Sequence, residues 1–323
     1  MLSHWIQAAR PKTLPLAVSG ILLGSAVAYI NHSFIPSTFY LGLLTAILLQ
    51  ILSNFANDYG DFVKGTDVLA GRKDRMLAAG NISVSQMRMA LVMTAMAALI
   101  SGIALLWFSL HANALWFLLF LVLGFAAIAA ALAYTMGKKA FAYTGLGDPV
   151  VFIFFGWVAV GGIGYLHGDS LQLDTLLAGT GCGLLSVAVL NVNNMRDMDT
   201  DAAAGKRTIA LRLGVKKALL YHRMLVWLGF TAVFLSFAYN LQQKHEGIMP
   251  FEYLLILGVF SPVMIIIAGH IHRTSAAVLQ RHEEAEIDNR MAMREAFNPE
   301  LKKLSLSILL ITLIYWLLTY LLG

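Results

Sequence analysis

Long apolar stretches along most of the chain limit the folds that are open to this sequence. A window of about 19 residues finds about nine of them, each near the roughly 20 residues that a helix needs to cross a bilayer. Membrane barrels instead alternate polar and apolar residues in strands of about ten residues, whereas the stretches in this chain are continuously apolar. Over the whole chain, 59% of residues are hydrophobic and only 13% are charged, as is typical of a membrane protein. We therefore expect an all-α, multi-spanning transmembrane helical bundle that forms a single integral-membrane domain over residues 1–323. The predicted spans are residues 14–32, 38–56, 87–108, 113–135, 149–167, 172–192, 219–239, 251–271 and 304–322.

Basic residues are distributed unequally between the two ends of these spans. The chain has 23 Lys and Arg residues. All of them except Lys244 lie at the N-terminus, in the connections that follow the second, fourth, sixth and eighth spans, or at the start of the next helix. Because positively charged connections stay in the cytoplasm, we expect a cytoplasmic N-terminus and site in the plasma (bacterial inner) membrane. An odd number of spans then places the C-terminus outside.

The net charge of +5 follows from this asymmetry. It gives no reason to expect binding to nucleic acid. Membrane lipid is the expected surrounding, and no obligate protein partner is evident from the sequence.

Two similar polar motifs follow the second and the sixth span. Residues 57–61 read NDYGD and residues 193–197 read NNMRD, so both have the form Asn, then Asn or Asp, two further residues and Asp. The repeat favours two related halves around a central cavity open to the cytoplasm. On helices, each motif gathers polar residues on one face. The two faces are Asn54, Asp58 and Asp61, and Asn194, Asp197 and Asp201.

Converging carboxylates repel each other in a low dielectric, and a divalent cation between them removes the repulsion. Oxygen ligands without nearby His or Cys favour Mg²⁺, which keeps positions open for phosphate oxygens. Basic residues follow both motifs and can neutralise a leaving diphosphate. Carboxylates, Mg²⁺ and cations at a membrane surface thus indicate a lipid diphosphate as substrate.

Other interpretations of these residues exist. A single Lys or Arg in a cytoplasmic loop is more often a topology determinant. Paired acids also occur in cation-coupled transporters, but those usually lie near the middle of the bilayer on broken helices. A CDP-alcohol phosphotransferase would need an Asp-Gly-x-x-Ala-Arg motif, which the sequence does not contain.

The two motifs, with the segment that runs from residue 190 to 214, resemble the UbiA superfamily of membrane prenyltransferases. The resemblance is greatest to its 1,4-dihydroxy-2-naphthoate polyprenyltransferase branch, which acts in menaquinone synthesis. The segments most similar to that branch are RPKTLPLA (10–17), LQILSNFANDYGDFVKGTD (49–67), YTGLGD (143–148), FIFFGW (152–157) and residues 190–214. The resemblance covers residues 10 to about 217. It departs from that branch at GRKDRMLAAG (71–80), where a Gly-Pro is expected before the arginine.

The resemblance implies roles for individual residues. Asp58, Asp61, Asp197 and Asp201 would hold Mg²⁺, with Asn57 and Asn194 beside the metal and the diphosphate, and Tyr134 would lie near the site. Phosphate contacts would come from Arg75, Lys138, Lys206 and Arg212, with Arg72 and Lys73 as alternatives to Arg75.

The implied reaction transfers a polyprenyl group from an isoprenyl diphosphate to 1,4-dihydroxy-2-naphthoate, with loss of CO₂ and diphosphate. Another aromatic acceptor, such as 4-hydroxybenzoate, is the alternative.

Overall fold

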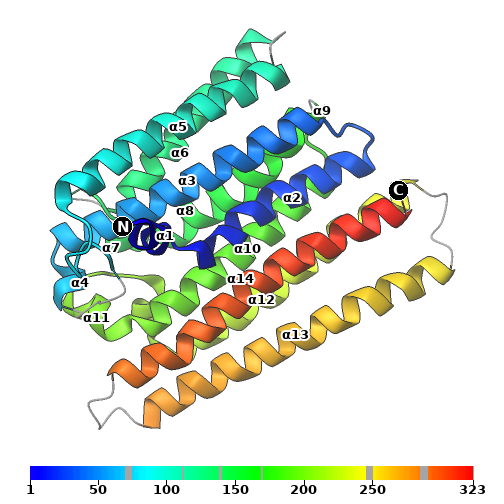
Figure 1. The fold of residues 1–323 in the computed structure, drawn as a ribbon. Helices are drawn as coiled ribbons and strands as arrows, with labels where there is room; N and C mark the ends of the chain where they lie inside the picture. The colour runs from blue at the N-terminus through cyan, green and yellow to red at the C-terminus, as the bar shows by residue number, and fades with distance from the viewer. Residues whose placement is uncertain are drawn as a thin grey trace.

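The computed structural model describes residues 1–69, 75–110, 113–137, 140–168, 170–244, 250–283 and 290–322, and no strand occurs among them. Long helices run side by side as one bundle (Figure 1). They are α2 (Leu14–Ile30), α3 (Pro36–Val63), α5 (Val84–Leu110), α6 (Ala114–Ala133), α10 (Leu173–Arg196), α12 (Ile209–Lys244), α13 (Pro250–Glu283) and α14 (Arg290–Leu322). One further rod joins α8 (Gly147–Val151), the π-helical segment η2 (Phe152–Gly161) and α9 (Gly162–Gly168).

Within the described ranges, eight helices are long and apolar enough to cross a membrane. The remaining predicted span, residues 251–271, lies within α13. The prediction of an all-helical membrane bundle is confirmed.

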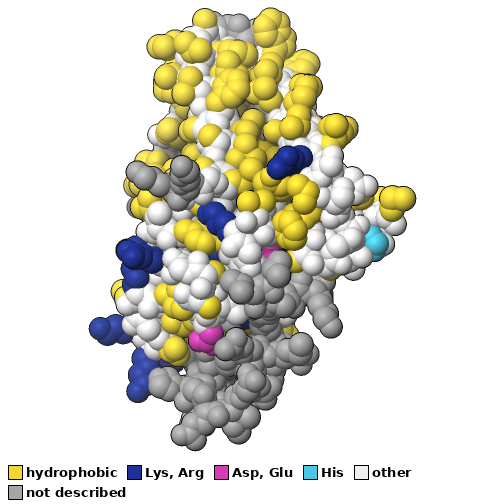
Figure 2. Space-filling view, turned by 90° about the vertical axis from the view of Figure 1, so that its left-hand side faces the viewer, with side chains coloured by type: hydrophobic (Ala, Val, Ile, Leu, Met, Phe, Trp, Pro, Cys, Tyr) yellow, Lys and Arg dark blue, Asp and Glu magenta, His cyan; other side chains and the backbone are white. Residues whose placement is uncertain are grey.

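Short helices gather at one end of the bundle, which we call the polar end. They are α1 (Leu2–Ala9), α4 (Thr66–Leu69), α7 (Phe141–Thr144) and α11 (Met198–Ala203), with the 3₁₀ turn η1 (Pro11–Thr13) between α1 and α2. The N-terminus lies at this end and the C-terminus at the other (Figure 1). Figure 2 looks onto the polar end, where Lys and Arg side chains are visible below a hydrophobic surface.

The main core surrounds α10, which packs against α12 and η2. Cys182 of α10 is 1% exposed within this core, as expected for a packed thiol. By contrast, α6 buries none of its side chains. Its apolar surface is therefore available for contact with lipid. In a soluble protein, an apolar surface of this size would have to be covered by other parts of the protein.

The two motifs lie at helix ends at the polar end. Helix α3 continues through the first motif to Val63, as predicted. Helix α10 stops at Arg196 and α11 starts after the single residue Asp197. Backbone hydrogen bonds span this break, because the amide of Asp197 donates to the carbonyl of Asn193 and the amide of Asp201 donates to the carbonyl of Asp197. Helical spacing is thus kept through the second motif.

Candidate active site

A polar cavity of about 70 Å³ lies at the polar end, between the ends of α3 and α10. Residues of both motifs line it, together with residues from α4, α8 and α11. Its acidic and amide side chains are Asp61, Asp67, Asp148, Asp197, Asp201, Asn57, Asn193 and Asn194. The prediction that the two motifs converge on one site therefore agrees with their positions in the fold.

Lys206 connects the two motifs directly. Its Nζ lies 3.4 Å from Oδ1 of Asp61 and 3.2 Å from Oδ1 of Asp201. Burial lowers the pKa of Lys206, but the two carboxylates raise it more, so the net shift is upward and the ammonium stays charged. Burial also raises the pKa of Asp201 to about 6, with Lys206 opposing the rise and Asp197 adding to it.

Tyr143 of α7 supports the same carboxylate. Its hydroxyl donates to Oδ1 of Asp61 at 3.0 Å and lies 2.6 Å from Oγ1 of Thr66. Burial and the charge of Asp61 raise the pKa of Tyr143 to about 12, so the hydroxyl keeps the proton that it donates. The ammonium of Lys64 lies 3.7 Å from the centre of the tyrosine ring, within cation–π distance.

Arg196 is the partner of Asp197 in the second motif. Its guanidinium reaches both carboxylate oxygens of Asp197, at 3.0 and 2.5 Å. It also donates to Oδ1 of Asn193 at 2.7 Å and to Oδ1 of Asn298 in α14 at 2.8 Å. A fork of donors with several fixed acceptors holds one orientation, so Arg196 fixes Asp197 and ties α14 to the motif.

Arg75 lies where an anion could bind. Its Nε is 3.6 Å from Oδ1 of Asp67, and within the described residues Nε and one terminal nitrogen are buried without a hydrogen-bond partner. Buried donors of this kind are costly unless they are satisfied. A phosphate oxygen would satisfy them.

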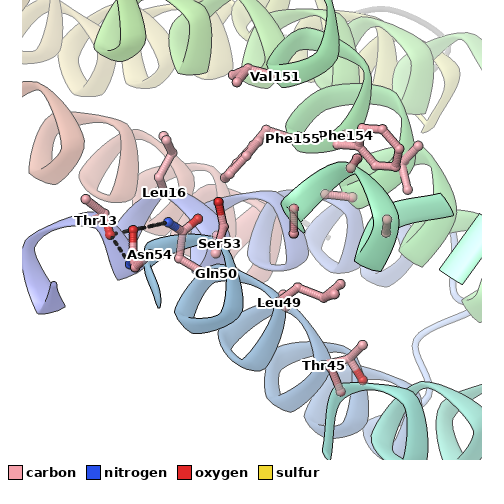
Figure 3. Close-up of a pocket in the computed structure, with 18 of the residues that line it drawn as sticks. Thr13, Leu16, Thr45, Leu49, Gln50, Ser53, Asn54, Val151, Phe154 and Phe155 are labelled. Atoms are coloured by element: carbon pink, nitrogen blue, oxygen red, sulfur yellow. Dashed lines mark hydrogen bonds between the residues drawn. The ribbon is translucent and has the colours of Figure 1, made fainter. Parts of the chain in front are cut away.

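A second, larger cavity of about 950 Å³ adjoins the polar one. Figure 3 shows part of its lining, where Gln50 and Asn54 of α3 donate hydrogen bonds to Oγ1 of Thr13, with Val151 and Phe155 across the space. Most of its remaining lining is aliphatic or aromatic and comes from α2, α3, α5, α6 and η2. Five residues line both cavities: Arg10, Asn57, Arg75, Tyr134 and Asn193.

Tyr134 lies at this junction, as the resemblance implies. Burial raises the pKa of its hydroxyl well above the usual value, and the charge of Asp148 adds to the effect. The hydroxyl therefore stays protonated and can donate a hydrogen bond at the boundary between the polar and the apolar space.

Some predicted site residues lie elsewhere. Asp58 is 1% exposed and lines neither cavity. Arg212 is exposed, donates to the carbonyl of Thr144 at 2.8 Å, and also lines neither cavity. Lys138, Arg72 and Lys73 lie outside the described residues.

Sequence reasoning gave no role to several residues that line the polar cavity or contact a residue that does. Asp148 accepts a hydrogen bond from Tyr221 at 3.1 Å, while Tyr143 and Arg196 contact Asp61 and Asp197 as described above. Tyr143 and Asp148 are the first and last residues of YTGLGD (143–148), and this segment could have identified them from the sequence. Tyr143 contacts Asp61, and Asp148 lines the polar cavity. Arg196 lies inside the second motif itself.

The residues present fit Mg²⁺ bound together with a substrate. The polar donors are carboxylate, amide and hydroxyl oxygens, which suit a hard cation. Among the described residues, no group of three or more His, Cys, Asp or Glu is placed to hold a metal alone. Mg²⁺ commonly needs only one or two carboxylates plus phosphate oxygens, so a site completed by diphosphate matches this donor set.

Known proteins resemble the chain in sequence and in fold. The model of the UbiA prenyltransferase family matches residues 17–241. The 1,4-dihydroxy-2-naphthoate octaprenyltransferase of Escherichia coli (strain K12) is 44% identical over 227 residues, which cover 69% of this chain and 72% of that protein. The Haemophilus influenzae protein of the same name is 44% identical over 232 residues, covering 70% and 74%.

Two solved structures share the fold. A UbiA homolog from Archaeoglobus fulgidus bound to GPP and Mg²⁺ superposes with a TM-score of 0.58 at 15% identity, covering 99% of both chains. The apo structure of a UbiA homolog from Aeropyrum pernix K1 gives 0.59 at 19% identity, covering 99% of this chain and 98% of that one. The match to the family model includes both motifs, and the relatives and the fold point to the same family. This multi-pass membrane protein therefore belongs to the UbiA prenyltransferase family.

Proposed function

We propose that the protein transfers a polyprenyl group from an isoprenyl diphosphate to 1,4-dihydroxy-2-naphthoate, giving demethylmenaquinone. The observation that carries this proposal is the junction of the two cavities. A diphosphate suits the polar cavity, with its cations Arg75 and Lys206, and an isoprenoid chain suits the apolar cavity of about 950 Å³. The reacting carbon, which joins the two parts of the donor, then lies near Tyr134 and Asn57.

The residues that line the two cavities contribute to this reaction in different ways. Arg75 and Lys206 bind the diphosphate and stabilise its charge as the bond from carbon to oxygen breaks. Asp61, Asp197 and Asp201 would hold Mg²⁺, and when bound this ion would neutralise charge on the leaving diphosphate. The apolar walls keep water away from the allylic cation.

The acceptor supplies the electrons for the new bond. The ring carbon that bears the carboxylate bonds to the first carbon of the prenyl group. The bond to the carboxylate then breaks, its electron pair restores the aromatic ring, and CO₂ leaves. The protein contributes mainly by positioning the two substrates.

The choice of acceptor is supported by the relatives named as 1,4-dihydroxy-2-naphthoate octaprenyltransferases. We further propose that the protein resides in the bacterial inner membrane with its N-terminus in the cytoplasm. The basic residues at the polar end support this orientation. The site would then face the cytoplasm, where soluble substrates can reach it.

The acceptor is tested with purified protein, Mg²⁺, a polyprenyl diphosphate and naphthoate labelled in its carboxyl carbon. Labelled CO₂ should be released in step with diphosphate and with prenylated product. Prenylation of 4-hydroxybenzoate at an equal or higher rate would show that the acceptor assignment is wrong.

A further inference from the structure

The ammonium group of Lys206 occupies the space between the two motifs. Its Nζ contacts one carboxylate oxygen from each motif, Oδ1 of Asp61 and Oδ1 of Asp201. The side chains of Lys206, Asp61 and Asp201 are 11%, 6% and 7% exposed, so water screens these three charges only weakly. A buried cation between two buried anions contributes an electrostatic cross-link between α3 and α11.

Neighbouring groups hold Lys206 in this position. It follows Gly205, whose φ of +73° turns the chain after α11, and its amide donates to the carbonyl of Asp201 at 2.9 Å. The ring of Tyr143 lies 5.1 Å from the ammonium, and the tyrosine hydroxyl fixes the same oxygen of Asp61 that Lys206 contacts. The bridge is thus built from both the backbone and side chains.

A divalent cation would compete for the same two oxygens. Mg²⁺ binds oxygen at about 2.0–2.1 Å, and an ion that close to both carboxylates would also lie close to Nζ. The repulsion between the ammonium and the metal would be strong in a buried site. Lys206 and a metal shared by Asp61 and Asp201 therefore exclude each other.

A diphosphate changes this balance. Its oxygens offer the ammonium new partners, because Lys binds phosphate as a compact charge with three donors. The polar cavity that Lys206 lines also contains Arg75 and has room beside the two carboxylates. Movement of the ammonium onto phosphate would free both carboxylates for the metal.

We propose that Lys206 acts as an internal counter-cation that blocks metal binding at Asp61 and Asp201 until a diphosphate draws it away. The metal and the prenyl donor then bind cooperatively, and the free enzyme has low affinity for the metal. This inference rests on the proposed function only in taking the donor to be a diphosphate.

The test measures Mn²⁺ binding to the purified protein by the loss of the free-ion signal in electron paramagnetic resonance. Without any diphosphate, Lys206→Met should bind Mn²⁺ at least about tenfold more tightly than the wild type. A tenfold change corresponds to ~1.4 kcal/mol, a modest part of the repulsion between close charges in such a site. Lys206→Gln, which keeps a hydrogen-bond donor, should show the same change and serves if the methionine variant does not fold.

Lys217→Met is the matched control, because it removes one exposed lysine charge near the start of α12, the helix that follows Lys206 in the chain. Its Mn²⁺ affinity should equal that of the wild type. In the wild type, an unreactive thiolo analogue of geranyl diphosphate should raise Mn²⁺ affinity, and this gain should shrink in Lys206→Met.

Three results would overturn the proposal: unchanged Mn²⁺ affinity in both Lys206 variants, an equal gain in Lys217→Met, or no effect of the analogue on the wild type. None of these measurements contains the aromatic acceptor. A failure here is therefore distinct from a failure of prenyl transfer to naphthoate.

Discussion

Asp61 and Asp201 come from different helices and share one ammonium group, whereas Asp197 pairs with its own neighbour Arg196. These buried acids are thus balanced by cations in two different ways. After Asp61→Asn, Lys206 keeps Asp201 as its partner, and after Asp197→Asn, Arg196 keeps its acceptors on Asn193 and Asn298. The site should therefore lose function before the fold loses stability.

Asp61→Asn and Asp197→Asn should each lower the rate of diphosphate release about a hundredfold, the scale of losing one preorganised group that stabilises charge. The double variant should be hardly slower than the poorer single variant, because groups that act as a unit give non-additive losses. Raising Mg²⁺ should partly restore the single variants by mass action.

Asp199→Asn is the control for these variants, because Asp199 is exposed and does not line the polar cavity. Its rate should stay close to that of the wild type. Losses that multiply and do not respond to Mg²⁺ would contradict a shared site for the metal and the diphosphate.

At the scale of helices, small residues let α2 approach the rod of η2 and α9. A Cβ on Gly24 would lie 2.4 Å from both Cγ2 of Ile163 and the carbonyl oxygen of Val160. Real atoms do not approach so closely, and the obstructing backbone cannot rotate away as a side chain can. Close backbone contact through small residues is a common way to pack membrane helices.

Gly24→Ala should therefore lower the free energy of unfolding in detergent by about 1–3 kcal/mol, the usual cost of overpacking. Gly124→Ala in α6 has no neighbour within 4 Å and should be neutral or more stable by up to about 1 kcal/mol. Thermal unfolding of the two variants checks this difference. Equal midpoints would mean that α2 can shift away at no cost.

The wall of the large cavity offers a second test at this scale. Ala46 lines it from α3, 11 residues before Asn57 and thus roughly 16 Å along the helix axis. Ala46→Phe should narrow the space for the distal part of the donor. We expect turnover of an octaprenyl donor to fall at least about tenfold, a loss of ~1.4 kcal/mol, while a geranyl donor reacts nearly as before.

Val92→Phe adds the same aromatic ring on α5, where the side chain is 57% exposed and lines neither cavity. It should treat both donors as the wild type does. If Ala46→Phe slows short and long donors equally, the donor chain does not extend past Ala46.

For the whole molecule, the N-terminus lies at the polar end and the C-terminus at the opposite end (Figure 1). The distribution of basic residues predicts that the polar end faces the cytoplasm. Because both motifs lie at this end, the orientation of the bundle also determines which side of the membrane the site faces.

Single cysteines placed at Ser170 and at Ala203 test this orientation in intact cells. Both positions are exposed: Ser170 lies shortly before the start of α10, and Ala203 ends α11, which follows the other end of α10. The native Cys182 is buried and should give little background. An impermeant thiol reagent should label Ser170→Cys and leave Ala203→Cys unlabelled until the cells are opened. The reverse pattern would place the site on the outer side.

The sequence by itself determined the membrane bundle, its spans and the meeting of the two motifs at one end. Continuous apolar stretches of spanning length permit few other folds. The equal chain directions of the second and sixth spans then bring NDYGD and NNMRD to the same side. The helical spacing of Asn194, Asp197 and Asp201 also survived, since backbone hydrogen bonds cross the break at Asp197.

Only the tertiary structure decided which polar side chains reach the cavities. Helical spacing alone grouped Asp58 with Asn54 and Asp61, whereas Asn57 lines both cavities and Asp58 lines neither. In a soluble helix the apolar face would reveal the inside, but a membrane helix is apolar toward lipid and toward its neighbours alike. The rotation of α3 about its axis, and with it the bridge from Asp61 through Lys206 to Asp201, is therefore fixed by packing between helices.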